Sequence, residues 1–388
     1  MKKKAMIITF ASDMSLHFDN VFKGEAAAQA AMAEPSAILA QADYSMVNLE
    51  NVLGDKESST PILKSGPNLI TEERFISYIH ALKPTVVGMA NNHSKDYGED
   101  VMFQTKKMLT DTGYICIGAG KNIEEAYIPA KLEKDGIRVA IIAVCENEFG
   151  VATAKISGTA GYSLGRVHKA IRQARAEGYK PVIYFHGGNE KNPFPSPGKV
   201  ELYRHFVDLG AEAVVAMHTH CPQGYEIYEG KPIIYSMGNF FFPAEVKELS
   251  WFYGYLSQLE FTEESVNLTI HPYRFDREGV KMLTGDDLSY FTRYMQVLCE
   301  PINDEEKLQE LFDSWHYIGG YIHGFDWFEP HYIADGWSEQ VKGMKNIFNC
   351  EAHNELVRNT FNMVFDGRME KAKGKIEFIQ KLQNMQID

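Results

Sequence analysis

Side chains that can bind a metal ion recur in this sequence at the ends of short apolar runs. The clearest case is His218-Thr219-His220, because two imidazoles that are two residues apart in an extended chain point to the same side. Carboxylate, amide and imidazole groups together form a mixed oxygen and nitrogen donor set, which suits divalent transition metals such as Mn, Fe or Zn. The polar groups at these positions are Asp13, Asn48, Glu50, Asn92, His186, His218 and His220.

The segment "GMANNHSKDYG" (88–98) adds two further polar groups, since His93 follows Asn92 directly and Asp96 lies three residues later. Asn is a poor strand residue, and polar side chains at the mouth of an apolar run do not fill a core. Each group alone has an ordinary explanation. A lone Asp is usually a helix cap or turn residue, and a lone His is more often a hydrogen-bonded structural residue. Their repetition at five separate segments favours a shared metal site.

The apolar runs themselves have the length and composition of β-strands. They are rich in β-branched residues and too short for helices, and helical patterns lie between them. This alternation predicts an α/β protein with mainly parallel strands, whose carboxyl ends share one edge where ligands bind. The predicted strands cover 5–10, 44–49, 85–90, 114–118, 138–145, 181–186 and 211–218, and the predicted helices cover 33–42, 71–82, 98–112, 166–178 and 199–210.

The pattern changes in the second half of the chain. Residues 224–242 and 254–275 have the alternation of antiparallel strand pairs, and the chain is helical beyond about residue 280. We therefore expect a main domain at 1–280 and a helical region at 281–388 that packs on it. An apolar stripe at three- and four-residue spacing predicts one helical face. It consists of Phe365, Met369, Ala372, Ile376, Ile379 and Leu382.

Aromatic residues are dense at the start of this helical region. They are expected to form a packing interface with the main domain, and the alternative is a platform for sugar or peptide. The residues concerned are Trp315, Tyr317, Tyr321, Phe325, Trp327, Phe328, Tyr332 and Trp337.

Composition excludes some partners. The 388 residues include 39 basic and 52 acidic ones, a formal charge of −13, which argues against nucleic acid or an anionic membrane as the main partner. The N-terminal run ends soon at Asp13 and is interpreted as a strand, and no segment approaches the ~20 apolar residues of a membrane span. We expect a cytoplasmic protein, or an envelope protein if an anchor has been trimmed.

The motifs taken together resemble the CapA/PgsA family, bacterial proteins linked to capsule and poly-γ-glutamate biosynthesis. That family looks like a branch of the calcineurin-like metallophosphoesterases. The combination of "NLE", "ANNHSKDYG" and "YSMGNF" is the most specific part of the resemblance. The matching segments are "FASD" (10–13), "ADYSMVNLE" (42–50), "ANNHSKDYG" (90–98), "IGAG" (117–120), "FHGGNE" (185–190), "HTHCPQGYEIYEGKPIIYSMGNFFF" (218–242) and "YGYLSQLEF" (253–261).

The resemblance implies a four-layer αββα sandwich with a two-metal site. Asp13 stands at the position of the first aspartate ligand and Glu50 at that of the bridging carboxylate. Asn92 takes the position of the asparagine ligand. His186, His218 and His220 match the remaining ligands. His93, next to Asn92, matches the catalytic histidine, which Asp96 would orient.

The implied function is metal-dependent hydrolysis of a phosphoester or a γ-linked glutamyl substrate, with an anionic small molecule or polymer as partner. One departure favours an alternative. Phosphoesterases usually carry Asp-x-His after the first strand, whereas this chain has Asp13-Met14-Ser15, so one metal loses a histidine. The alternative is a non-catalytic, polymer-handling or capsule-assembly subunit on a phosphatase-like scaffold, because one fold hosts many functions.

Overall fold

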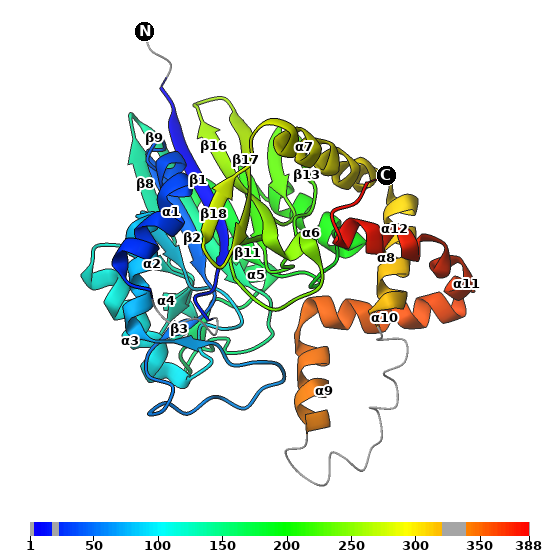
Figure 1. Ribbon diagram of the computed structural model, residues 1–388, viewed down its shortest axis with the longest axis horizontal. Coiled ribbons are helices and arrows are strands. Elements are labelled where there is room, and N and C mark those ends of the chain that lie inside the picture. Colours follow the sequence, from blue (N-terminus) through cyan, green and yellow to red (C-terminus); the bar gives the residue numbers. More distant parts are fainter. Residues whose placement is uncertain (1–3, 18–22, 320–338, 388) are drawn as a thin grey trace.

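The computed structural model describes residues 4–17, 23–319 and 339–387, which form two large sheets with helices around them (Figure 1). The first sheet has the strand order β18-β17-β16-β1-β2-β5-β6, and β15 also pairs with β1. β1, β2, β5, β6 and β15 are parallel, whereas β16 to β18 extend the sheet in an antiparallel manner. The strands are β1 (Met6–Met14), β2 (Tyr44–Leu49), β5 (Val86–Gly88), β6 (Ile115–Ile117), β15 (Asn239–Phe241), β16 (Tyr253–Phe261), β17 (Val266–Asp276) and β18 (Gly279–Met282).

The second sheet has the order β13-β14-β12-β11-β9-β8. Its four central strands are parallel, and the two edge strands are antiparallel to their neighbours. The strands are β8 (Ala130–Lys134), β9 (Ile137–Cys145), β11 (Lys180–His186), β12 (Ala213–Met217), β13 (Tyr225–Tyr228) and β14 (Lys231–Ile234). Two small pairs complete the strands, β3 (Val52–Leu53) with β4 (Ile70–Thr71) and β7 (Ala119–Gly120) with β10 (Gly158–Thr159).

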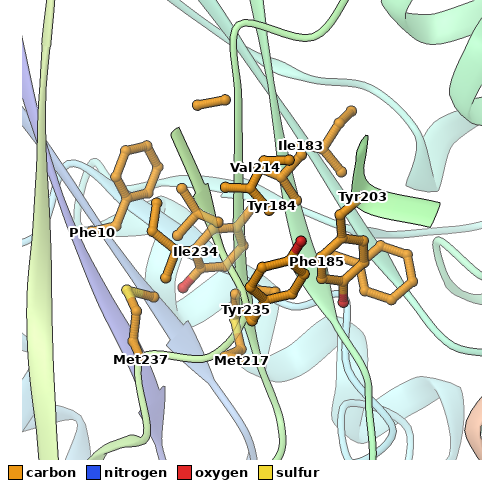
Figure 2. Close-up of a cluster of buried hydrophobic side chains, with 14 of the residues drawn as sticks. Phe10, Ile183, Tyr184, Phe185, Tyr203, Val214, Met217, Ile234, Tyr235 and Met237 are labelled. Atoms are coloured by element: carbon orange, nitrogen blue, oxygen red, sulfur yellow. The ribbon is translucent and has the colours of Figure 1, made fainter. Parts of the chain in front are cut away.

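The two large sheets pack face to face through a common core. Phe10 of β1 stacks on Tyr184 of β11 with 5.9 Å between ring centroids, and the Tyr184 hydroxyl donates to the Ala11 carbonyl at 2.8 Å. Figure 2 shows Phe10 and Tyr184 in this core together with Ile234 and Met237. The shared core joins the two sheets into one hydrophobic unit.

Helices cover the outer faces. α1 (Glu25–Leu39), α2 (Ile76–Leu82) and α3 (Gly98–Asp111) share a second core with the first sheet, and α5 (Leu164–Ala176) and α6 (Pro197–Asp208) pack on the second sheet. α4 (Ile123–Ala126) is a single short turn beside β7. The α/β class and the four-layer order of helices, sheet, sheet and helices are therefore confirmed.

The predicted helix at 33–42 was placed too late, because α1 begins at Glu25 and ends at Leu39. Its sequence "EAAAQAAMAEPSAIL" is rich in alanine, the strongest helix former, so the helix is already established before Pro35. Pro35 then lies on a buried face with Ala28 and Met32. Packing of this face against the sheet offsets the hydrogen bond that the proline removes.

The C-terminal region is helical where it is described, from α7 (Gly285–Cys299) and α8 (Glu305–Ile318) to α9 (Glu339–Asn349), α10 (Glu351–Phe365), α11 (Met369–Ala372) and α12 (Ile376–Gln383). The predicted single apolar stripe is wrong. Phe365 ends α10 and is 86% exposed, and Gly367 adopts a positive φ of 68° that breaks the helix before Met369. Division of the chain at residue 280 stays a prediction.

Most of the predicted aromatic cluster lies outside the described residues, namely Tyr321, Phe325, Trp327, Phe328, Tyr332 and Trp337. Trp315 is buried in the core and stacks on Phe312 at 6.2 Å between ring centroids. None of the helices in the described part of the chain is long and apolar enough to cross a membrane.

Candidate metal centre

The polar groups at the strand ends come from both sheets. Asp13 lies near the end of β1 and faces Asn48 of β2 in the parallel register, and Glu50 follows β2 directly. His186 is the last residue of β11, and His218 follows β12. The main-chain N–H of His218 donates to Asp13 Oδ2 at 2.8 Å, so the carboxyl ends of the two sheets meet at one point.

His186 lies at the centre of the cluster. Its Nε2 is 3.0 Å from His218 Nδ1, 3.0 Å from Asn92 Oδ1 and 3.5 Å from Glu50 Oε1. Its Nδ1 is 3.3 Å from Asp13 Oδ1. Two sets of three residues each offer ligand atoms within 4.8 Å of one another, Glu50 with His186 and His218, and Asp13 with Glu50 and His220. The structure thus brings all six candidate ligands together, with Glu50 common to both sets.

Glu50 is in an electrostatically costly environment. It is fully buried, and both of its carboxylate oxygens lack a hydrogen-bond partner among the described residues. Burial raises the pKa of Glu50 well above its ordinary value, and the negative charge of Asp13 raises it further. A buried carboxylate without a partner is strongly unfavourable unless a cation compensates it.

The imidazoles are suited to the same role. Burial, followed by the nearby His186 and His220, holds the pKa of His218 well below its ordinary value. Its ring is therefore neutral at pH 7 and keeps a lone pair for a ligand. The unpartnered oxygens of Glu50 and the donor set around them fit a divalent transition metal ion.

The two histidines of "HTH" converge for a reason that differs from the sequence-based expectation. β12 ends at Met217, and the backbone is not extended beyond it, since His218 has φ 100° and His220 has φ 56°. Such values are rare for residues with a Cβ and cost free energy. The His220 ring is held by Asn239, whose Oδ1 lies 2.8 Å from Nδ1.

His93 forms a separate pair beside the cluster. Its Nδ1 lies 2.6 Å from Asp96 Oδ2, and Lys64 Nζ lies 2.6 Å from Asp96 Oδ1 and 3.2 Å from His93 Nδ1. Because the carboxylate accepts, Nδ1 carries the proton and Nε2 holds the lone pair. Burial and the Lys64 charge lower the pKa of His93 to about 4, so the ring is neutral at pH 7.

Asn48, which also lies at a strand end, donates to Asp13 Oδ1 at 2.8 Å. Two other residues that contact the cluster escaped the strand-end pattern. Lys64 and Glu148 lie in loops without periodicity, and no local signal marks them. Glu148 Oε2 accepts from Asn92 Nδ2 at 2.6 Å.

The comparisons with known proteins agree with the motifs. A family model described as "Bacterial capsule synthesis protein PGA_cap" matches residues 8–244, more than half of the chain. The chain is 28% identical over 215 residues to "Capsule biosynthesis protein CapA" of Bacillus anthracis, covering 53% of this chain and 52% of the relative. It is 27% identical over 209 residues to "PGA biosynthesis protein CapA" of Bacillus subtilis, covering 53% and 54%. The chain thus spans about half the length of the curated relatives it matches.

Among solved structures, the chain is similar to a 5'-nucleotidase precursor from Thermus thermophilus, with a TM-score of 0.39, 14% identity and coverage of 77% of this chain and 59% of the other. The layer order follows from the strand pairing and the two cores.

Proposed function

This chain belongs to the bacterial capsule synthesis protein family PGA_cap, and from that premise we propose that it is a metal-dependent hydrolase acting on a phosphoester or a γ-linked glutamyl chain. The observation that carries the proposal is the pair of Glu50 oxygens, which are fully buried and have no hydrogen-bond partner in the described structure. Three imidazoles and a second carboxylate surround them. A cation bound here would compensate the charge of both carboxylates.

The ligands would be the strand-end groups, and they would hold one or two ions of Mn, Fe or Zn. Glu50 belongs to both three-residue sets and would be shared between two ions. A bound divalent cation would supply Lewis acidity that polarises a phosphoryl or carbonyl oxygen. The residues concerned are Asp13, Glu50, Asn92, His186, His218 and His220.

His93 would transfer the proton, and Asp96 would orient the His93 ring. The Nδ1 proton donated to Asp96 fixes the tautomer, and the low pKa keeps the Nε2 lone pair available at pH 7. Nε2 can take a proton as water attacks and return it to the leaving group, which is general base and then general acid catalysis. Lys64 Nζ contacts Asp96 Oδ1 at 2.6 Å and holds this side chain in place beside His93.

The test is His93→Asn, measured as Mn²⁺-dependent hydrolysis of a phosphodiester, a phosphomonoester and a γ-glutamyl oligomer. We expect the variant to keep its fold and its metal and to lose about 10²–10⁴ in rate, the usual contribution of general acid or base catalysis. His168→Asn is the matched control, because His168 is exposed on α5. If the wild-type protein shows no Mn²⁺-dependent activity on any of the three substrates, hydrolysis of these substrates is excluded.

A second candidate is a non-catalytic, polymer-handling subunit. Two observations favour it: Ser15 stands where a phosphoesterase has a histidine, and the groups at the centre are barely accessible, with His93 7% and His220 5% exposed. For this candidate we expect γ-linked glutamyl oligomers to bind without turnover, and Glu50→Ala to abolish binding in a calorimetric titration. Turnover of the oligomer by the wild type would exclude it.

A further inference from the structure

We infer that Glu148 is a positioning residue, which sets the orientation of the Asn92 amide, and that Asn346 of α9 holds Glu148 in place. The inference rests on the proposed function, since Asn92 is one of the proposed ligands. Glu148 lies in the loop after β9, and Asn346 belongs to the C-terminal helices, outside the residues 8–244 that match the family.

The orientation of the Asn92 amide follows from the chemistry of its neighbours. Asn92 Nδ2 lies 2.6 Å from Glu148 Oε2, and a carboxylate can only accept a hydrogen bond. The NH₂ group must therefore face Glu148. The amide oxygen then faces the cluster, where it is 3.0 Å from His186 Nε2. Without Glu148 the amide could turn and present its NH₂ group, which cannot bind a cation.

The other oxygen of Glu148 is used by the C-terminal region. Asn346 Nδ2 donates to Glu148 Oε1 at 3.1 Å, so the carboxylate joins α9 to Asn92. Glu148 and Asn346 are 9% and 8% exposed, so their hydrogen bond lies in a region of low dielectric. Asn346 Oδ1 is buried and has no hydrogen-bond partner in the described structure. It could therefore accept a hydrogen bond if Glu148 were replaced by a residue that can donate one.

Carboxylates of α10 hold this helix pair against the loops around the centre. Glu351 accepts from the main-chain N–H of Asn147 at 2.9 Å. Glu355 accepts from Ser196 Oγ at 2.7 Å and from the N–H of Gly198 at 3.1 Å. α9 and α10 adjoin, α9 contacts the loop after β9, and α10 contacts the loops after β9 and β11. The C-terminal helices therefore form part of the site's support.

The experiment reverses the direction of one hydrogen bond. Asn346→Asp places a carboxylate against Glu148 and removes the donor, whereas Glu148→Gln together with Asn346→Asp lets the new amide donate to the new carboxylate. This double variant has the same formal charge as the wild type. Asn349→Asp is the matched control, since it makes the same change on the same helix at an exposed position.

Two measurements are made on the full chain: Mn²⁺ affinity by calorimetry, and amide hydrogen exchange of α9 in metal-free protein. We expect Glu148→Ala to weaken Mn²⁺ binding 10–100-fold, the range typical of residues that orient a ligand. Asn346→Asp should weaken binding and speed α9 exchange. The double variant should recover both, and the Asn349→Asp control should change neither.

The outcomes separate the inference from the proposed function. If the wild type binds Mn²⁺ and Glu148→Ala binds it equally well, the positioning role of Glu148 is wrong while the proposed function stands. If the wild type binds no Mn²⁺, the proposed function and the role toward Asn92 both fail. Hydrogen exchange then decides the α9 contact alone, and equal α9 exchange in wild type and Asn346→Asp would overturn it. A double variant that stays as weak as Asn346→Asp would also contradict the hydrogen-bond coupling.

Discussion

Two clusters of buried carboxylate, amide and imidazole groups lie in different parts of this protein. One is the candidate metal centre at the strand ends. The other, which we call the α8–α10 network, joins these two helices, and Arg368 after α10 completes it. The α8–α10 network consists of Gln309, Asp313, His316, Asn359, Thr360 and Arg368.

The two clusters differ in how their buried carboxylates are compensated. Asp313 accepts from Gln309 at 2.8 Å and from Asn359 at 3.0 Å, and its other oxygen pairs with Arg368. Neither oxygen of Glu50 has a hydrogen-bond partner within the described structure. The same residue types therefore indicate different roles. A satisfied network stabilises the fold, whereas buried oxygens without a partner indicate a place for a ligand.

The largest expected effect is on the stability of the α8–α10 network. Asp313→Ala should lower the free energy of unfolding by about 3 kcal/mol, because it leaves Arg368 and Asn359 without their buried acceptor. Urea denaturation measures this change. Asp366→Ala is the control, since this exposed carboxylate contacts the same Arg368 at 3.5 Å and should cost no more than about 1 kcal/mol. Equal losses in both variants would contradict the comparison.

Glu50→Gln should behave in the opposite way. Without metal, the variant should be as stable as the wild type or more stable, because the amide replaces a carboxyl group whose charged form is disfavoured by burial. With Mn²⁺ at 100 times the dissociation constant, the wild type should gain about 2.7 kcal/mol and the variant should gain much less. Elemental analysis should show that Glu50→Gln loses more bound metal than His93→Ala does. If metal-free Glu50→Gln were destabilised as much as Asp313→Ala, the two clusters would not differ in how they contribute to stability.

A smaller effect concerns the pH dependence of the α8–α10 network. Burial lowers the pKa of His316 from 6.5 to about 4, so the unfolded chain binds the proton more tightly than the folded one. Stability contributed by the neutral ring is present above pH 6.5 and is lost as pH falls toward 4. Between pH 7 and pH 5 the loss should be about 2 kcal/mol.

The measurement compares unfolding of wild type and His316→Gln at these two pH values. The variant should show a pH dependence smaller by about 2 kcal/mol, whatever its stability at pH 7. His168→Gln, at an exposed position, should leave the pH dependence unchanged. An unchanged pH dependence in His316→Gln would show that this ring is not held neutral by its burial.

Much of the candidate centre could be predicted from the sequence, because it depends on local patterns. Short β-branched runs form parallel strands, and the residues that end them must lie near one edge of a sheet. Asp13 and His186 were placed there on that ground, and the structure brings them within 3.3 Å. The resemblance to a known family added the expectation that Glu50 is a bridging carboxylate, which stays a prediction. In the structure Glu50 belongs to both groups of three potential ligands.

The tertiary structure alone decided which groups oppose and support this edge. The meeting of the two sheets, seen in the bond from the His218 N–H to Asp13, joins residues 205 positions apart that no local pattern connects. Glu148 and Lys64 come from aperiodic loops, and Asn346 from a helix whose polar residues look like any solvated face. Periodicity reports only which side of an element is apolar, whereas a contact between distant segments depends on how the complete layers pack.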